Sequence, residues 1–206
     1  MIQNLVFLLE ESSAKAMLQE IVPQLIDETI TVKYLTFEGK QDLERNLARK
    51  LRDWQFPNTA FIVLRDQDSA NCIEVKQRLK DICTKSGKPE TLVRIACHEL
   101  ESFYLGDLEA VSTAYNLSMP SQNSRKFRDT DKLSNAADEL SKITNKQYQK
   151  IDGSRRIGHL LKLDGSNRSH SFNVLCDGIR QIAAPKSQNT ASIPSSHNPP
   201  INLKQQ

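Results

Sequence analysis

The sequence predicts an α/β protein with an open, mainly parallel sheet that is flanked by helices and followed by a C-terminal helical extension. Three observations predict this class. Short apolar runs of strand length alternate with amphipathic segments of helix length over the first two thirds of the chain. The apolar runs are nearly continuous, as in strands that are buried on both faces. Strands that alternate with helices pair in parallel through right-handed crossovers, with helices covering both faces.

The first element is the apolar run at residues 5–9, which predicts a buried strand. A helix capped by Ser12 or Ser13 should follow, because apolar residues recur after it at helical spacing. Pro23 lies late in this helix and is expected to kink it. Residues 31–35 alternate less cleanly and predict a more exposed strand.

A turn at residues 38–40 leads into a helix whose predicted core positions are Leu43, Leu47, Leu51 and Trp54. Residues 60–64 then form the second strongly apolar strand. Ser69 is a candidate cap for a helix that runs to about Cys83, and the sequence Gly-Lys-Pro at 87–89 breaks that helix.

A further strand is predicted at residues 91–97, and it runs directly into a helical stripe that continues to Val111. Residues 1–119 are therefore assigned to an α/β core, and 120–184 to a helical extension with patterns around 133–143 and 172–179. From Pro185 to Gln206 the chain is rich in Pro, Ser, Asn and Gln, which predicts a disordered tail.

Composition excludes several classes of protein. No apolar run approaches the roughly 20 residues of a membrane helix, and the start lacks the basic and cleavage-site features of a signal peptide, so a cytoplasmic protein without membrane contact is expected. The four cysteines form no C-x-x-C pair and are expected to be buried thiols. Phosphate-loop, dinucleotide and G-x-S-x-G motifs are absent.

Charge is distributed unevenly along the chain. Residues 1–119 carry 14 Lys and Arg against 18 Asp and Glu, whereas residues 120–184 carry 12 against 7. This asymmetry is compatible with metal chemistry in the first part beside a polyanion-binding surface in the second.

Acidic residues follow three of the predicted strands. Because the carboxyl ends of parallel strands meet at one edge of the sheet, these side chains should converge there. Carboxylate oxygens arranged in this way suit Mg²⁺ or Mn²⁺, which activates water and neutralises charge on a phosphate. The residues are Glu10, Glu11, Asp66, Asp68, Glu99 and Glu101.

A purely structural interpretation stays open for each acid, because Asp and Glu near strand ends often cap the following helix. Asp68 and Glu101 are the acids most suited to that role. His98 is expected to be a neighbour of the sheet rather than a base. The polar groups that can meet phosphate are Lys40, Arg65, Arg155, Arg156, Arg168 and His170.

Several blocks of the sequence, taken in order, resemble the DUF4276 family of bacterial proteins, and the resemblance spans roughly residues 1–183. The blocks are LLEESSA (8–14), FEGKQDL (37–43), LRDQDS (64–69), ELESFYLGD (99–107) and NRSHSF (167–172). This resemblance implies a Toprim-like fold, related to the Toprim domains of OLD-family nucleases, and an AAA or ABC-type ATPase encoded nearby.

Toprim domains bind Mg²⁺ through a glutamate after the first strand and an Asp-x-Asp after a later one. By position, Glu10 looks like that glutamate, and Asp66 and Asp68 look like the Asp-x-Asp. Toprim proteins usually have glycine after the glutamate, whereas this chain has Glu11, which therefore joins the candidate ligands.

The leading hypothesis is a Mg²⁺- or Mn²⁺-dependent Toprim-type nuclease that acts on DNA or RNA, as the effector of an ATPase-associated anti-phage system. Glu10, Glu11, Asp66, Asp68 and Glu101 are the predicted metal ligands, and Glu99 completes the site or polarises water. The alternative is a non-catalytic adaptor that binds or restrains the ATPase.

Overall fold

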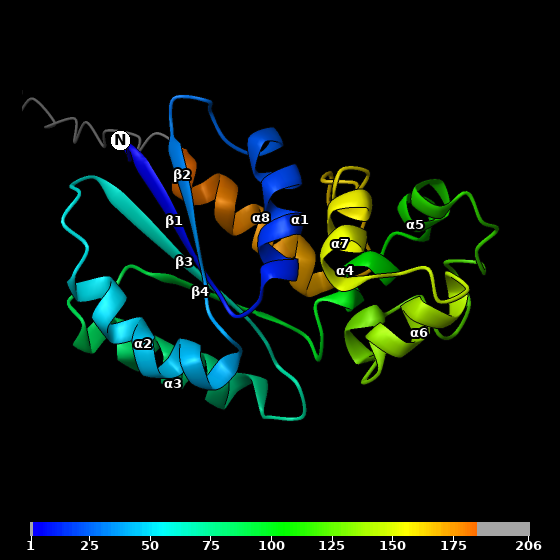
Figure 1. Cartoon of the computed structure of the whole chain (residues 1–206), viewed down its shortest axis with the longest axis horizontal. Helices are drawn as coiled ribbons and strands as arrows, with labels where there is room; N and C mark the ends of the chain where they lie inside the picture. Colours follow the sequence, from blue (N-terminus) through cyan, green and yellow to red (C-terminus); the bar gives the residue numbers. More distant parts are fainter. Residues whose placement is uncertain (1, 185–206) are drawn as a thin grey trace, which may run out of the picture.

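The structure is a computed structural model of the 206-residue chain, and it describes residues 2–184 (Figure 1). Four strands form one sheet in the order β2-β1-β3-β4, and every pair is parallel. Helices cover both faces, so the predicted fold class is confirmed. The tail predicted at 185–206 lies outside the described residues. The strands are β1 (Asn4–Leu9), β2 (Thr31–Thr36), β3 (Thr59–Asp66) and β4 (Leu92–Ala96).

The helices surround the sheet and extend beyond its carboxyl end (Figure 1). Among residues 2–184, no helix is long and apolar enough to cross a membrane. The α-helices are α1 (Ser12–Ile21), α2 (Lys40–Arg52), α3 (Cys72–Lys85), α4 (Glu101–Leu105), α5 (Leu108–Tyr115), α6 (Ala136–Ile143), α7 (Lys150–Gly158) and α8 (His170–Ala183); two 3₁₀ helices are η1 (Val22–Gln24) and η2 (Thr130–Lys132).

The central strands alternate their side chains between two apolar layers. On one face, Val6 and Leu8 of β1 pack with residues of β3 against α2 and α3, where the predicted core positions Leu43, Leu47 and Leu51 are buried. On the other face, the remaining residues of β1 pack against α1 and α8. Burial on both faces explains why these strands are apolar without interruption.

Strand β2 lies at the edge of the sheet and is only partly buried, as its less regular alternation predicts. Tyr34 stacks on Phe7 of β1, with ring centroids 5.3 Å apart. The preceding helix α1 ends at Ile21, and Pro23 occupies a 3₁₀ turn rather than a kink inside a longer helix. Proline suits the first positions of a new turn, because its missing N–H has no partner there.

Three predicted helix boundaries are wrong. Asn71, rather than Ser69, caps α3, because its side chain accepts hydrogen bonds from the N–H groups of Ile73 and Glu74. Glu11 holds the N-cap position of α1 without a side-chain hydrogen bond, so neither candidate serine caps that helix. The stripe predicted from 98 to 111 is two helices, because Asp107 caps α5 by accepting from the Ala110 N–H.

Helix α7 was not predicted, and it packs along α1 beside the sheet (Figure 1). Its sequence contains Gly153 and Gly158, which lower helix propensity and obscure the pattern. A Cβ at Gly158 would stand 3.2 Å from the Met17 Cα and 3.3 Å from its carbonyl oxygen. Glycine therefore allows the backbones of α7 and α1 to approach closely.

The extension contributes to the same core as the first part of the chain. Helix α6 contacts α4, α7 contacts α1 and α5, and α8 contacts β4. Residues of both 1–119 and 120–184 belong to one apolar cluster on the α1 face of the sheet.

Candidate active site at the carboxyl edge of the sheet

Acidic residues from neighbouring strands reach one edge of the sheet. Leu9 of β1 pairs with Leu64 of β3, so Glu10, which follows β1, lies beside the end of β3 where Asp66 stands. The Glu10 Oε2 accepts a hydrogen bond of 3.1 Å from the Asp66 N–H. Glu10 and Asp66 therefore lie at the same edge of the sheet.

Arg65 is an internal counter-ion on the α2 side of this edge. Its side chain is 5% exposed, with Nη1 2.5 Å from Glu44 Oε1, Nε 3.6 Å from Glu10 Oε2 and Nη2 4.0 Å from Asp68 Oδ2. Burial raises the pKa of Glu10, although the Asp66 N–H and Arg65 oppose this rise. The phosphate contact predicted for Arg65 would require it to leave these carboxylates.

Asp68 lies in a loop that is tied to the end of β4. Asp68 and His98 both adopt left-handed backbone conformations, with φ of 56° and 58°. The Asp68 N–H donates to the His98 carbonyl at 2.8 Å, and His98 Nδ1 lies 3.3 Å from the Asp68 carbonyl oxygen. His98 is thus a neighbour that shapes the loop, as expected. Backbone strain of this kind gathers at functional sites.

Exposed lysines pair with the two acids at the rim. Lys40, from the start of α2, places its Nζ 2.8 Å from Asp68 Oδ2, and this hydrogen bond raises its pKa. Lys150, from the start of α7, places its Nζ 3.2 Å from Glu11 Oε2. Burial lowers the pKa of Lys150, but Glu11 and Glu101 act in the opposite direction, and the net pKa lies above its ordinary value.

Asp66 and Glu101 form a second acidic pair on the α4 side of the edge. Glu101 is 2% exposed and accepts a hydrogen bond of 2.9 Å from the Tyr148 hydroxyl. Burial raises the pKa of Glu101, and burial, Glu10 and Glu101 together raise that of Asp66 well above its ordinary value. Within residues 2–184, neither carboxylate makes an ion pair.

Within residues 2–184, the remaining predicted residues make no hydrogen bond or ion pair with these carboxylates. Glu99 accepts a 2.8 Å hydrogen bond from the Ala137 N–H and so holds the N-terminus of α6. Arg156 donates to the Ala114 carbonyl at 2.7 Å and lies over the Tyr115 ring. The other three are exposed: Arg155 on α7, Arg168, which donates to Asn123, and His170 at the start of α8.

Sequence analysis did not identify Lys150, Tyr148 or Glu44. Lys150 and Glu11 are 139 positions apart, and Tyr148 and Glu101 are 47 apart, so no local spacing signals either contact. Glu44 lies on the helix that the leucine stripe predicts, but only the fold brings it to Arg65.

The donor chemistry of the edge suits Mg²⁺ or Mn²⁺, because Glu10, Asp66 and Glu101 offer only carboxylate oxygens. The Tyr104 hydroxyl is buried and has no hydrogen-bond partner within residues 2–184, and its pKa is raised by burial and by Glu101 and Asp66. In the structure of residues 2–184, no group of three His, Cys, Asp or Glu side chains is close enough together to hold a metal ion. Binding would require the carboxylates to draw together.

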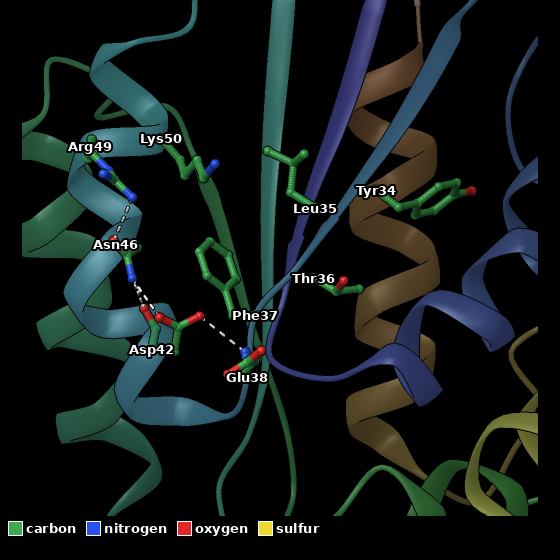
Figure 2. Close-up of a pocket in the computed structure, with 9 residues that line it drawn as sticks. All are labelled: Tyr34, Leu35, Thr36, Phe37, Glu38, Asp42, Asn46, Arg49 and Lys50. Carbon is green, nitrogen blue, oxygen red and sulfur yellow. Dashed lines mark hydrogen bonds between the residues drawn. The ribbon is translucent and has the colours of Figure 1, made fainter.

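A separate open groove of about 610 Å³ runs between the edge strand β2 and α2 (Figure 2). None of the predicted acids lines it. Its polar groups bond one another: Arg49 donates to Asn46, Asn46 donates to Asp42, and Asp42 accepts from the Glu38 N–H. The groove therefore differs from the acidic edge, by which we mean the strand-end carboxylates of Glu10, Glu11, Asp66, Asp68 and Glu101.

Comparison with known proteins gives one finding. A family model described as "Domain of unknown function (DUF4276)" matches residues 9–180. No curated protein and no solved structure matches the chain.

Proposed function

Because the chain belongs to the DUF4276 family, a domain of unknown function, we propose its activity from the acidic edge: it is a metal-dependent, Toprim-type nuclease that hydrolyses phosphodiester bonds in DNA or RNA. One observation carries the proposal. Glu101 is buried and Asp66 is half-buried beside Glu10, and among residues 2–184 neither makes an ion pair, although Lys150 acts on both at longer range.

Two neighbouring carboxylates in such a place need a positive partner, since burial and mutual repulsion both disfavour their charged forms. A proton is one partner and a divalent cation is the other. The ligands in the proposal are Glu10, Asp66 and Glu101, joined by Glu11 and Asp68 if their lysine partners release them. A bound Mg²⁺ or Mn²⁺ supplies an activated water and neutralises charge on the phosphate.

The surrounding residues have supporting roles in this proposal. Tyr148 fixes the Glu101 carboxylate by donating a hydrogen bond from its hydroxyl, and Arg65 orients Glu10 from within the protein. Lys40 and Lys150 are the exposed cations at the rim, where a phosphate of the substrate would meet them. Like-charged phosphate would compete with Asp68 and Glu11 for these lysines, which links substrate binding to release of two further acids.

The biological setting of the proposal is a cytoplasmic effector that works with an AAA or ABC-type ATPase in defence against phage. It rests on the Toprim-like resemblance and on the blocks of sequence quoted for it.

A specific observation favours the non-catalytic adaptor as the second candidate. Three of the acids already have protein cations: Arg65 faces Glu10, Lys40 faces Asp68 and Lys150 faces Glu11. A surface that satisfies its own charges can serve for docking without chemistry. In that case the edge would bind or restrain the ATPase.

A nicking assay on supercoiled plasmid separates the two candidates. The protein is incubated with Mg²⁺ or Mn²⁺, with and without the ATPase encoded beside it, and the open-circular product is quantified. We expect metal-dependent nicking that Asp66→Asn and Glu101→Gln abolish, whereas Asp138→Asn, an exposed acid in the first turn of α6, retains it. No nicking under any of these conditions, together with ATPase binding, would support the adaptor instead.

A further inference from the structure

A basic groove of about 520 Å³ lies on the extension, on residues 125–133, a segment that includes η2 and joins α5 to α6 along the chain. It is lined by Arg125, Lys126, Arg128 and Lys132, with Asp129 as its one acid and Leu133. None of these cations was among the predicted phosphate-binding residues. The groove accounts for a third of the 12 Lys and Arg that make residues 120–184 basic.

The loop that carries these cations is held firmly. The Gln122 side chain accepts from the Leu108 N–H at 2.7 Å and donates to the carbonyls of Leu105 and Phe127. Phe127 is 3% exposed, so its ring anchors the loop in the core. Cations on an ordered loop lose less conformational entropy on binding than cations on a flexible one.

The two arginines of the groove are free to bind a ligand. Both are exposed, and neither makes an ion pair or a side-chain hydrogen bond within residues 2–184. By contrast, Lys126 pairs with Glu139 at 2.7 Å and Lys132 pairs with Asp129 at 2.6 Å. Guanidinium groups match the oxygens of phosphate in a two-pronged geometry, so Arg125 and Arg128 are suited to that anion.

The groove is also connected to the acidic edge. Asp131 of η2 accepts hydrogen bonds from Ser169 and Ser171, and the Ser171 hydroxyl in turn accepts from the Cys97 N–H directly after β4. The α6 helix, whose Glu139 pairs with Lys126, is held at its start by Glu99. Both connections tie the segment that carries the groove to residues that follow β4, the strand next to β3 and its Asp66.

We propose that this groove binds the sugar-phosphate backbone of a nucleic acid and leads the strand toward the acidic edge. The inference rests on the proposed function and deepens it by naming the surface that holds the substrate. Among residues 2–184, no aromatic ring lines the groove, so it would contact phosphates without stacking bases. Binding would then be tolerant of sequence and strongly dependent on salt.

The test measures binding of fluorescein-labelled duplex DNA, single-stranded DNA and RNA by fluorescence anisotropy, in EDTA so that no cleavage occurs. The variant is Arg125→Ala/Arg128→Ala. The matched control is Arg45→Ala/Arg52→Ala, which removes two exposed arginines of α2 that also make no ion pair among residues 2–184. Circular dichroism verifies that each variant is folded.

Each phosphate contact contributes a slope of about 0.9 to the dependence of log affinity on log salt for duplex DNA. Loss of two contacts should flatten the slope by about 1.8 and weaken binding about 60-fold at roughly 0.1 M salt. The control should keep the slope and affinity of the original protein.

Unchanged nucleic-acid affinity in the groove variant overturns the inference, and lost association with the ATPase in that variant would identify the groove as a protein-docking surface instead. Failure of the proposed function has a different signature. In that case the groove variant still loses binding, but the original protein nicks no plasmid with either metal.

Discussion

Replacing Gly153 with alanine tests whether the packing of α7 positions the hydrogen-bond donor of Glu101. A Cβ at Gly153 would stand 2.4 and 2.5 Å from two carbons of the Tyr148 ring and 2.8 Å from the Tyr115 hydroxyl oxygen. Carbon atoms do not approach so closely, so the Tyr148 ring must move. Its hydroxyl would then leave Glu101, to which it donates at 2.9 Å.

Three contributions set the expected size of the effect. Overpacking of a core costs about 1–3 kcal/mol. A buried acceptor that loses its partner costs about 1–3 kcal/mol more. Alanine in place of glycine inside a helix returns about 1 kcal/mol. The free energy of unfolding should therefore fall by about 1–5 kcal/mol.

Urea unfolding followed by far-UV circular dichroism measures this change. Tyr148→Phe is the control that removes the donor without crowding, and it should show only the loss of the hydrogen bond. In a Tyr148→Ala background, which removes the clash with that ring and leaves only the contact with the Tyr115 hydroxyl, Gly153→Ala should cost less than it does in the original protein. If Gly153→Ala alone stabilises the protein, as helix propensity by itself would predict, the reasoning about α7 is refuted.

Two further predictions concern the charges of the acidic edge. Arg65→Met should destabilise the protein by about 3–5 kcal/mol, because it leaves the buried Glu10 without its cation, and Arg65→Lys should recover part of that loss in the same urea assay. Burial raises the pKa values of Glu10, Asp66 and Glu101 above their ordinary values of 4.5, 3.8 and 4.5. At a pH between the ordinary and the raised pKa values, the folded state therefore binds more protons than the unfolded state. Their contribution to stability should consequently be lost as pH rises through the raised pKa values, and Asp66→Asn should reduce this dependence in urea titrations at several pH values. A pH dependence as steep in Asp66→Asn as in the original protein would contradict the assignment.

The sheet and its acidic edge could be predicted because their signals are local. Continuous apolar runs mark β1 and β3, and parallel pairing then determines that Glu10 and Asp66 meet at one end. The family assignment was also available from ordered blocks of sequence, and the match over residues 9–180 confirms it. The Toprim-like kinship and the roles of the acids stay predictions.

The contacts that distinguish one carboxylate from another could not be predicted. The pairing of Asp68 with Lys40 depends on the direction of the loop after β3, in which Asp68 itself has a left-handed backbone conformation. The lack of an ion pair at Asp66 among residues 2–184 depends in the same way on the fold rather than on local sequence. Helix α7 escaped detection for a related reason. Its glycines are favourable only because α1 and Tyr148 lie against them, which is information held by distant parts of the chain.

The position of α8 has a consequence for how the chain is made. A Cβ at Gly178 would stand 2.7 Å from Leu92 Cδ2 and 2.8 Å from Arg94 Nη2, and Arg94 donates to the Val174 carbonyl at 3.1 Å, so this helix fits closely over β4. The ribosome completes all four strands long before it releases residues 170–183. Until then the nascent sheet lacks the cover of Phe172, Leu175 and Ile179 on one face, and cooperative folding must wait for α8. A chain that stalls or is truncated before α8 would accordingly expose this apolar face of the sheet and bind chaperones rather than fold stably.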